Sequence, residues 1–144
     1  MNMSKIFGVL FGLLAIVVMS ASRPGGKGID FSTEAYSEVL KQAKTENKLI
    51  FVDLYTSWCA PCKWLDKNVF NDSEVGSFYN TNFINVHYDA MKGDGSMLAD
   101  KNNVRSVPSF LYINGDGKVV MRGEEAIYTN QLIDLGKKAL QHAN

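Results

Sequence analysis

The sequence predicts an α/β fold: a three-layer α/β/α sandwich around a central mixed β-sheet. Short apolar segments typical of strands alternate with longer segments whose apolar residues recur every three or four positions, as in amphipathic helices. The last two strand segments are separated only by the turn sequence NGDG at residues 114–117, so that pair is expected to be antiparallel. A chain of 144 residues is long enough to form one domain with a substantial core.

The first part of the predicted domain is a helix, a strand and a second helix. Residues 32–47 have apolar residues at helical spacing, and Ser32 is the expected N-cap. Residues 49–55 form a nearly continuous apolar run, typical of a central strand that is covered on both faces. Residues 60–70 are expected to be helical, because a proline stands near the first turn.

Six further elements are expected after this helix. In order, they are a short helix capped by Asp72 or Ser73, a strand at residues 83–88, a short helix at 96–102, a hairpin of strands at 109–113 and 118–122, and a closing helix capped by Thr129. The alternation of helices and strands implies crossover connections and a parallel section of sheet, to which the hairpin adds an antiparallel edge.

The composition excludes several classes of function. Lysine plus arginine number 15, as do aspartate plus glutamate, so the net charge is zero and we expect no nucleic-acid partner. A hydrophobic fraction of 46% excludes an intrinsically disordered chain. Two cysteines are too few for a disulfide-dense scaffold, and with only two histidines they make a poor zinc module.

Residues 1–22 have the layout of a secretory signal peptide. Lys5 is followed by an uncharged apolar run at residues 6–18 and then by small residues. As a helix this run is about 20 Å long, shorter than a membrane core of ~30 Å, although an uncleaved anchor remains an alternative. We therefore expect a linker at residues 23–28 and a domain at 29–144. Its expected location is the periplasm or another extracytoplasmic space, where disulfides persist.

Both cysteines of the chain lie in one Cys-x-x-Cys motif, Cys59 to Cys62, which follows a predicted strand and opens a predicted helix. Residues i and i+3 at a helix start point the same way, so the two sulfurs can form a disulfide. The N-terminus of a helix favours a thiolate, which is the species that attacks disulfides. Cys59 is the expected nucleophile, and Cys62 the more buried resolving thiol.

Three other interpretations of the motif remain open. The pair could be a purely structural disulfide, although so short a loop would constrain the unfolded chain little. It could be half of an intermolecular zinc site, with the missing ligands supplied by a partner. It could also be two buried, inert thiols.

The segments around the motif resemble the thioredoxin family. Residues 51–63, FVDLYTSWCAPCK, resemble its active-site segment, and residues 104–110, VRSVPSF, resemble its second signature, in which the proline is cis and faces the cysteines. Residues 69–75, VFNDSEV, further resemble the thioredoxin-like C-terminal domain of periplasmic thiol:disulfide interchange proteins. The similarity covers about residues 29–140 and implies a thioredoxin fold with disulfide-exchange activity.

The resemblance also implies a substrate-binding surface around the cysteines. Its expected members are Trp58, Ala60, Pro61, Val107, Pro108 and Gly123. A cis Pro108 lacks an N–H and would leave the space beside the sulfurs free of a competing donor. The backbone of Val107 would pair with an extended substrate segment, and Trp58 would flank the nucleophile. Gly123 would line the same groove.

Asp53 stands six residues before Cys59, where the family keeps a buried carboxylate. Burial raises the pKa of a carboxyl group, so Asp53 could accept the proton of Cys62 and allow the mixed disulfide to resolve. The alternative is an aspartate that caps a nearby N–H. The lysine that thioredoxins usually place near this carboxylate is not evident, because the matching strand reads NFINVHY at residues 82–88. His87 in that strand is expected to be a structural histidine with a local hydrogen bond.

These features predict an exported thiol-disulfide oxidoreductase that acts on protein disulfides, needs no cofactor or metal and works as a monomer. The two residues between the cysteines offer no charged or histidine donor, which favours a low potential, closer to about −270 mV than −120 mV, and hence the reducing direction. Electrons would come from another protein's dithiol, which could be membrane-embedded. A disulfide oxidase or isomerase, a non-catalytic peptide-binding module and a copper-delivery domain are the alternatives.

Overall fold

A computed structural model describes residues 27–124 and 128–143 of the protein. The predicted signal peptide at residues 1–22 and most of the predicted linker lie outside the described residues, so both remain predictions. No helix in the described part of the chain is long and apolar enough to cross a membrane.

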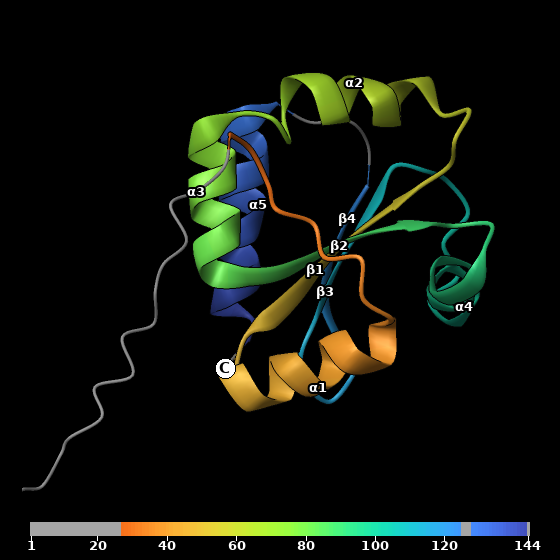
Figure 1. Ribbon diagram of the computed structural model, residues 1–144, viewed down its shortest axis with the longest axis vertical. Coiled ribbons are helices and arrows are strands. Elements are labelled where there is room, and N and C mark those ends of the chain that lie inside the picture. The colour runs from red at the N-terminus through yellow and green to blue at the C-terminus, as the bar shows by residue number, and fades with distance from the viewer. Residues whose placement is uncertain (1–26, 125–127, 144) are drawn as a thin grey trace, which may run out of the picture.

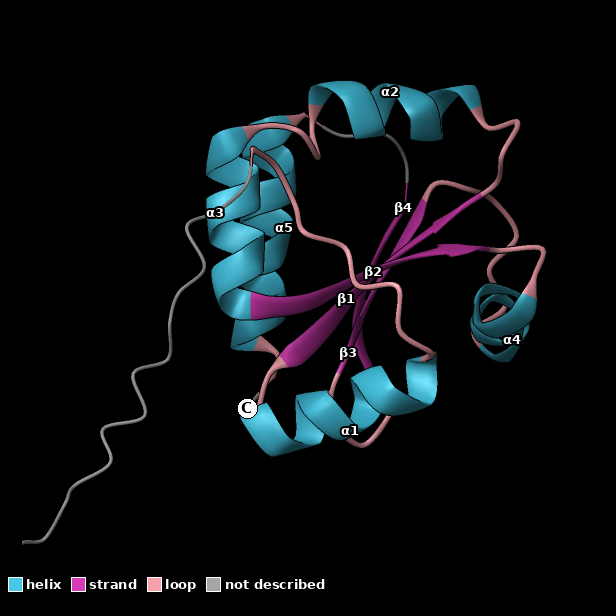
Figure 2. Cartoon of the chain, viewed as in Figure 1, coloured by secondary structure: helices cyan, strands magenta, loops and turns pink. Residues whose placement is uncertain are grey.

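A four-stranded mixed sheet forms the centre of the molecule (Figure 2). Its strands, in chain order, are β1 (Leu49–Tyr55), β2 (Phe83–Asp89), β3 (Ser109–Ile113) and β4 (Val119–Glu124). Their spatial order is β2-β1-β3-β4, with β1 parallel to β2 and antiparallel to β3, and with β3 antiparallel to β4. The predicted parallel section and the antiparallel hairpin are both confirmed.

Helices cover both faces of this sheet (Figure 1). They are α1 (Tyr36–Glu46), α2 (Ala60–Asn68), α3 (Ser73–Asn82), α4 (Gly93–Lys101) and α5 (Thr129–Gln141). Helices α1 and α4 pack on one face, and α2, α3 and α5 pack on the other. The predicted three-layer α/β/α sandwich is therefore confirmed.

Each face of the sheet has its own core, because side chains alternate between the two faces of a strand. The core under α1 and α4 is almost wholly aliphatic and consists of Tyr36, Val39, Ala43, Ile50, Val52, Leu54, Ile84, Val86, Leu98, Ala99, Leu111 and Ile113. The core under α2, α3 and α5 is rich in aromatic rings and consists of Leu49, Phe51, Leu65, Val69, Phe70, Val75, Tyr79, Phe83, Phe110, Tyr112, Leu132, Ile133 and Ala139.

Two predicted helix starts were wrong because tertiary contacts decide them. Ser32 does not cap α1, which begins four residues later; its backbone N–H instead donates to Asn85 O at 2.8 Å, in an isolated bridge to β2. Asp94, from α4, takes over the first turn of α1 by accepting a hydrogen bond from the Tyr36 N–H at 2.7 Å. Helix α4 itself begins at Gly93, three residues before the predicted start.

The other two predicted caps have different outcomes. Asp72 caps α3 as expected, since its carboxylate accepts hydrogen bonds from the backbone N–H groups of Glu74 and Val75. The prediction that Thr129 caps α5 was wrong. Thr129 is the first residue of that helix, and Tyr128 is its N-cap. The Gln131 side chain accepts a hydrogen bond from the Tyr128 N–H at 3.0 Å and ties down that end of the helix.

Gly28, which we placed at the end of the linker, is buried against α3. A Cβ atom on Gly76 would lie 2.1 Å from the Gly28 carbonyl oxygen, so the helix and the incoming segment approach too closely for any larger residue. The side chain of Asn80 donates a hydrogen bond to the same carbonyl at 3.0 Å. The packed part of the chain therefore includes residue 28.

Candidate active site

Cys59 and Cys62 form a disulfide at the start of α2, which lies over the sheet in Figure 1. Their Cα atoms are 5.3 Å apart. Cys59 is the N-cap residue of the helix, and its Sγ accepts a hydrogen bond from the Cys62 N–H at 3.1 Å. Pro61 stands in the first turn, where a missing N–H costs no helical hydrogen bond.

The two sulfurs differ in accessibility in the expected direction. Cys59 is 7% exposed and Cys62 is 3% exposed. Trp58, directly before the motif, is 68% exposed, and Ala60 and Pro61 are exposed as well. Three of the residues that the sequence assigned to substrate binding are thus exposed next to the disulfide.

The Val107–Pro108 peptide bond is cis, as the second signature implied. It immediately precedes β3, the strand that pairs with β1. Pro108 is buried and Val107 is partly buried.

Gly123 pairs with Phe110 on the neighbouring strand β3. A Cβ atom at this position would lie 2.5 Å from Leu135 Cδ2 of α5 and 3.3 Å from the Phe110 ring. A larger residue here would require the Leu135 side chain to move, and the expected role of Gly123 in lining the substrate groove stays a prediction.

Asp53 is a buried carboxylate in the middle of β1, 1% exposed. It shares a face of the strand with Phe51, so it points into the layer that contains α2. Among the described residues, no hydrogen-bond donor satisfies its Oδ1 atom. Burial raises the pKa of Asp53 well above its usual value, and the negative charge of Asp66 raises it further.

His87 lies directly beside Asp53, because the parallel register of β1 and β2 pairs these two residues. Its Nε2 is 3.7 Å from Asp53 Oδ2, and its Nδ1 is 3.9 Å from Asp66 Oδ1. Asp66 is on α2, four residues after Cys62 and hence on the same helical face. The imidazole therefore bridges a buried carboxylate and a half-exposed one beneath the disulfide-bearing helix.

The prediction of a local structural hydrogen bond for His87 missed this bridge. Burial lowers the pKa of His87, and the charge of Asp66 opposes that effect. Burial raises the pKa of Asp66, and the imidazole opposes that. Asp66 was not singled out from the sequence, although its spacing from Cys62 was available as a signal.

The three side chains are also the described residues that come nearest to a metal-binding arrangement. Their ligand atoms lie within 4.8 Å of one another. No fourth histidine, cysteine or acidic side chain of the described part of the chain joins the group, whereas structural zinc sites use four ligands. Two carboxylates joined by an imidazole are equally an arrangement that can hold and move a proton.

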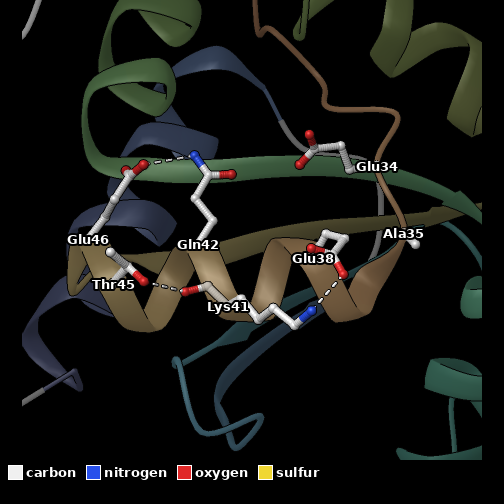
Figure 3. Close-up of a pocket in the computed structure, with 7 residues that line it drawn as sticks. All are labelled: Glu34, Ala35, Glu38, Lys41, Gln42, Thr45 and Glu46. Carbon is white, nitrogen blue, oxygen red and sulfur yellow. Dashed lines mark hydrogen bonds and ion pairs between the residues drawn. The ribbon is translucent and has the colours of Figure 1, made fainter.

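A hollow on the surface of α1 lies on the opposite face of the sheet from α2 (Figure 3). Its polar side chains are largely paired with each other: Lys41 contacts Glu38 at 2.8 Å, and Gln42 donates to Glu46 at 2.8 Å. It brings together none of the residues that the sequence selected for function.

Comparisons with known proteins agree with this geometry. The sequence model of a family described as thioredoxin-like matches residues 32–115, which include the disulfide, Asp53 and the cis-proline. The chain belongs to the thioredoxin-like family. This family consists of disulfide oxidoreductases, and the chain has the Cys59–Cys62 pair in place.

Relatives of this thioredoxin-like protein include thiol:disulfide interchange proteins and thioredoxins. Thiol:disulfide interchange protein DsbD from Yersinia pestis is 29% identical over 79 residues, 54% of this chain and 13% of DsbD, so the chain spans only a small part of that relative. Thioredoxin H4 from Arabidopsis thaliana is 29% identical over 111 residues, covering 77% of this chain and 85% of the relative.

A solved structure of a candidate disulphide-isomerase from Bacteroides thetaiotaomicron is 40% identical, with a TM-score of 0.72. The match covers 81% of this thioredoxin-like chain and 96% of that one. The oxidised C-terminal domain of DsbD from Neisseria meningitidis has a TM-score of 0.61 at 18% identity, covering 77% and 98% of the two chains, and so shows the shared fold alone.

Proposed function

We propose that this protein is an exported thiol-disulfide oxidoreductase that reduces disulfides in protein substrates. The observation that carries the proposal is the seating of Cys59 as the N-cap of α2, where its sulfur accepts a backbone hydrogen bond. In the reduced protein the same N–H, together with the positive end of the helix, stabilises a Cys59 thiolate.

The reaction proceeds by two exchanges. The Cys59 thiolate attacks one sulfur of a substrate disulfide, which forms a mixed disulfide and releases the other substrate sulfur as a thiolate. Asp53 accepts the proton of the Cys62 thiol, and the Cys62 thiolate attacks Cys59 Sγ. The mixed disulfide breaks, the second substrate thiolate leaves, and the internal disulfide holds the oxidised state. Two electrons pass from the protein to the substrate.

The burial of Asp53 supports its role as the base. Its position on the α2 face of β1, with Asp66 of α2 close enough to raise its pKa, puts it beneath the helix that carries Cys62. A carboxyl group whose pKa is raised holds and releases a proton closer to neutral pH than an exposed one. When a donor protein reduces the disulfide, Asp53 in turn supplies the proton that Cys62 takes up.

The surroundings of the disulfide support binding of an extended polypeptide. Trp58, whose side chain is exposed, directly precedes Cys59, and Val107 precedes the buried Pro108. We propose that backbone groups of Val107 pair with the substrate chain, and that Trp58, Ala60, Pro61 and Gly123 shape the approach to the sulfur. The expected partners are protein disulfides and an upstream dithiol protein, with the chain acting as a monomer and without a cofactor.

The proposed location is extracytoplasmic. It rests on the signal-peptide pattern of residues 1–22 and on the sequence similarity to DsbD proteins. The reducing direction rests on the neutral Ala60–Pro61 pair between the cysteines, which adds no cation to stabilise a thiolate.

The decisive experiment is substrate trapping in the cell of origin. In Cys62→Ser the Cys59 thiolate still attacks substrates, but the mixed disulfide cannot resolve, so covalent complexes accumulate and mass spectrometry identifies them. Cys59→Ser is the matched control and should trap none. Equal trapping by both variants would reverse the assigned roles, and no trapping by either, with no insulin reduction by the wild type, would overturn the function.

Whether the protein reduces or oxidises its substrates is tested by measuring its reduction potential in an equilibrium titration against glutathione. A potential near about −270 mV supports a reductase, whereas a value above about −150 mV contradicts it. Isomerisation is the second candidate, favoured by the 40% identity to the candidate disulphide-isomerase from Bacteroides thetaiotaomicron. Recovery of activity from a scrambled disulfide protein without net reduction would support it over the reductase.

A further inference from the structure

Three titratable side chains run in sequence from the interior of the protein to its surface. The Asp53 side chain is 1% exposed, the His87 side chain 21% and the Asp66 side chain 46%. Consecutive members are 3.7 Å and 3.9 Å apart, measured between Asp53 Oδ2 and His87 Nε2 and between His87 Nδ1 and Asp66 Oδ1. The two ring nitrogens of one imidazole thus face different carboxylates.

An enclosed base needs a path along which protons enter and leave. Asp53 is flanked in the sheet by His87 on one side and Phe110 on the other, and the ring of Phe110 is buried in the aromatic core. On the His87 side, the imidazole is held between the rings of Tyr55 and Phe31, with centroid distances of 3.9 Å and 5.2 Å. The two rings therefore confine the imidazole with each nitrogen near a different carboxylate, a few tenths of an ångström beyond hydrogen-bond distance.

We propose that His87 is the positioning residue through which Asp53 gains and loses its proton, with Asp66 as the exposed end of the path. The inference rests on the proposed role of Asp53 as the base for Cys62.

Proton transfer along this path balances at every step. After Cys62 has given its proton to Asp53, the Asp53 carboxylic acid passes a proton to His87 Nε2. The Nδ1–H of the same ring passes its proton to the Asp66 carboxylate, which releases it to water. Asp53 and Asp66 are again carboxylates, and His87 is again neutral but protonated on Nε2 in place of Nδ1.

The second half of the redox cycle restores the ring. When a donor dithiol reduces the internal disulfide, Cys62 leaves as a thiolate. His87 passes its Nε2 proton to the Asp53 carboxylate, which passes it on to the Cys62 thiolate, and Nδ1 takes a proton from water through Asp66. One oxidation and one reduction therefore return His87 to its first tautomer without any rotation of the ring.

The electrostatics of the cluster suit reversible transfer. Burial raises the pKa of Asp53 and lowers that of His87, which brings the proton affinities of the two groups closer together. The titratable groups that the described contacts place against His87 are Asp53 and the phenol Tyr55 from β1 and Asp66 from α2. The remaining ring, Phe31, does not titrate.

The test measures the two exchanges separately. A limiting amount of dithiobis(nitrobenzoate) is mixed with the reduced protein, and the release of the coloured thiolate is followed by stopped-flow absorbance. The first release reports attack by Cys59, and the second reports attack by Cys62 on the mixed disulfide. His87→Gln should lower the ratio of the second rate to the first about tenfold near neutral pH, and added imidazole should restore it.

Matched variants separate the inference from the function on which it rests. His142→Gln removes the only other histidine of the chain, at the exposed C-terminal end of α5, and should leave both rates unchanged. Asp66→Asn should lower the ratio only two- to threefold, because water can replace a half-exposed group. Asp53→Asn should lower the ratio at least as much as His87→Gln, without rescue by imidazole.

The outcomes discriminate between the two ideas. If Asp53→Asn slows the second release and His87→Gln does not, proton transfer through His87 is wrong and the role of Asp53 as the base is retained. If His87→Gln slows it but imidazole does not rescue it and the pH profile keeps its shape, the role of the ring is structural and proton transfer through it is wrong. If Asp53→Asn leaves the ratio unchanged, the role of Asp53 as base fails first.

Discussion

The two faces of the sheet bury comparable numbers of side chains but differ in chemistry. The face under α1 and α4 is aliphatic apart from Tyr36. The face under α2, α3 and α5 carries six aromatic rings in its core and, at its α2 end, a buried carboxylate, an imidazole and the disulfide. The first face stabilises the fold mainly through apolar burial, whereas the second must also keep a buried carboxylate and an imidazole in a fixed arrangement.

This difference shows how one sheet serves two purposes. Aliphatic side chains pack densely without polar partners, so the α1/α4 face can hold the sheet firmly. Polar groups on the other face are expensive to bury, and they remain there because the rigid strand pair β1–β2 holds them beside each other.

The largest expected loss of stability follows from Leu111→Ala, a fully buried residue of the α1/α4 face. The cavity and the lost transfer free energy should lower the free energy of unfolding by about 2–5 kcal/mol, measured by urea denaturation. In the protein that remains folded, the ratio of the two exchange rates should match the wild type. A drop in that ratio as large as the one expected for Asp53→Asn would contradict the separate roles of the two faces.

A smaller effect is expected from the hydroxyl pair in the aromatic core. Tyr79 OH donates to Leu132 O at 2.8 Å and lies 2.6 Å from Tyr112 OH, which therefore acts as its donor. Tyr79→Phe leaves two buried groups without a partner and should cost about 2 kcal/mol. Tyr112→Phe leaves Tyr79 donating and should cost about 1 kcal/mol. Urea denaturation of both variants measures the order, and the reverse order would contradict the donor assignment.

Asp53→Asn should change the pH dependence of stability. The pKa of Asp53 is raised in the folded protein, so its contribution to stability is fully present below its unfolded pKa and is lost as the pH rises through its folded pKa. The variant should therefore be more stable than the wild type at neutral and alkaline pH, and the gap should close toward pH ~4. Urea denaturation across this range measures it, and a gap that widens at acid pH would mean that the sign is wrong.

The smallest effect is expected on the surface of α1. Lys41→Ala removes an exposed ion pair with Glu38, visible in Figure 3, and should change the free energy of unfolding by less than about 0.5 kcal/mol. Insulin reduction should not change. A clear loss of activity would assign a function to the α1 hollow, which our interpretation does not.

Much of the fold could be predicted because local patterns were strong. The strands at residues 49–55 and 109–113 have the predicted bounds, since continuous apolar runs between turn signals leave little choice. Helix starts were harder. Ser32 is a good N-cap by type, but its backbone pairs with β2, and Asp94 from a distant helix takes over the first turn of α1. No local signal reports such a partner.

The active site, too, could be predicted only where the signal lay within a short segment of sequence. The Cys-x-x-Cys motif, the buried Asp53 and the cis Pro108 were all visible as short segments of sequence. The neighbourhood of His87 was within reach: aligning the starts of the two predicted strands, Leu49 with Phe83, pairs Asp53 with His87. That step required knowing that the strands are adjacent and parallel. Asp66 joins them only because α2 brings its carboxylate to 3.9 Å from His87 Nδ1.

The sequence by itself determined the number and order of the strands and helices, the pairing of the two thiols in one motif, and the family to which the chain belongs. These properties depend on neighbours within a few positions along the chain. Only the tertiary structure decided what surrounds Asp53, because a strand's neighbour and the helix above it come from segments about 34 and 13 positions away. Proton affinity depends on distances through space, and those are fixed by packing.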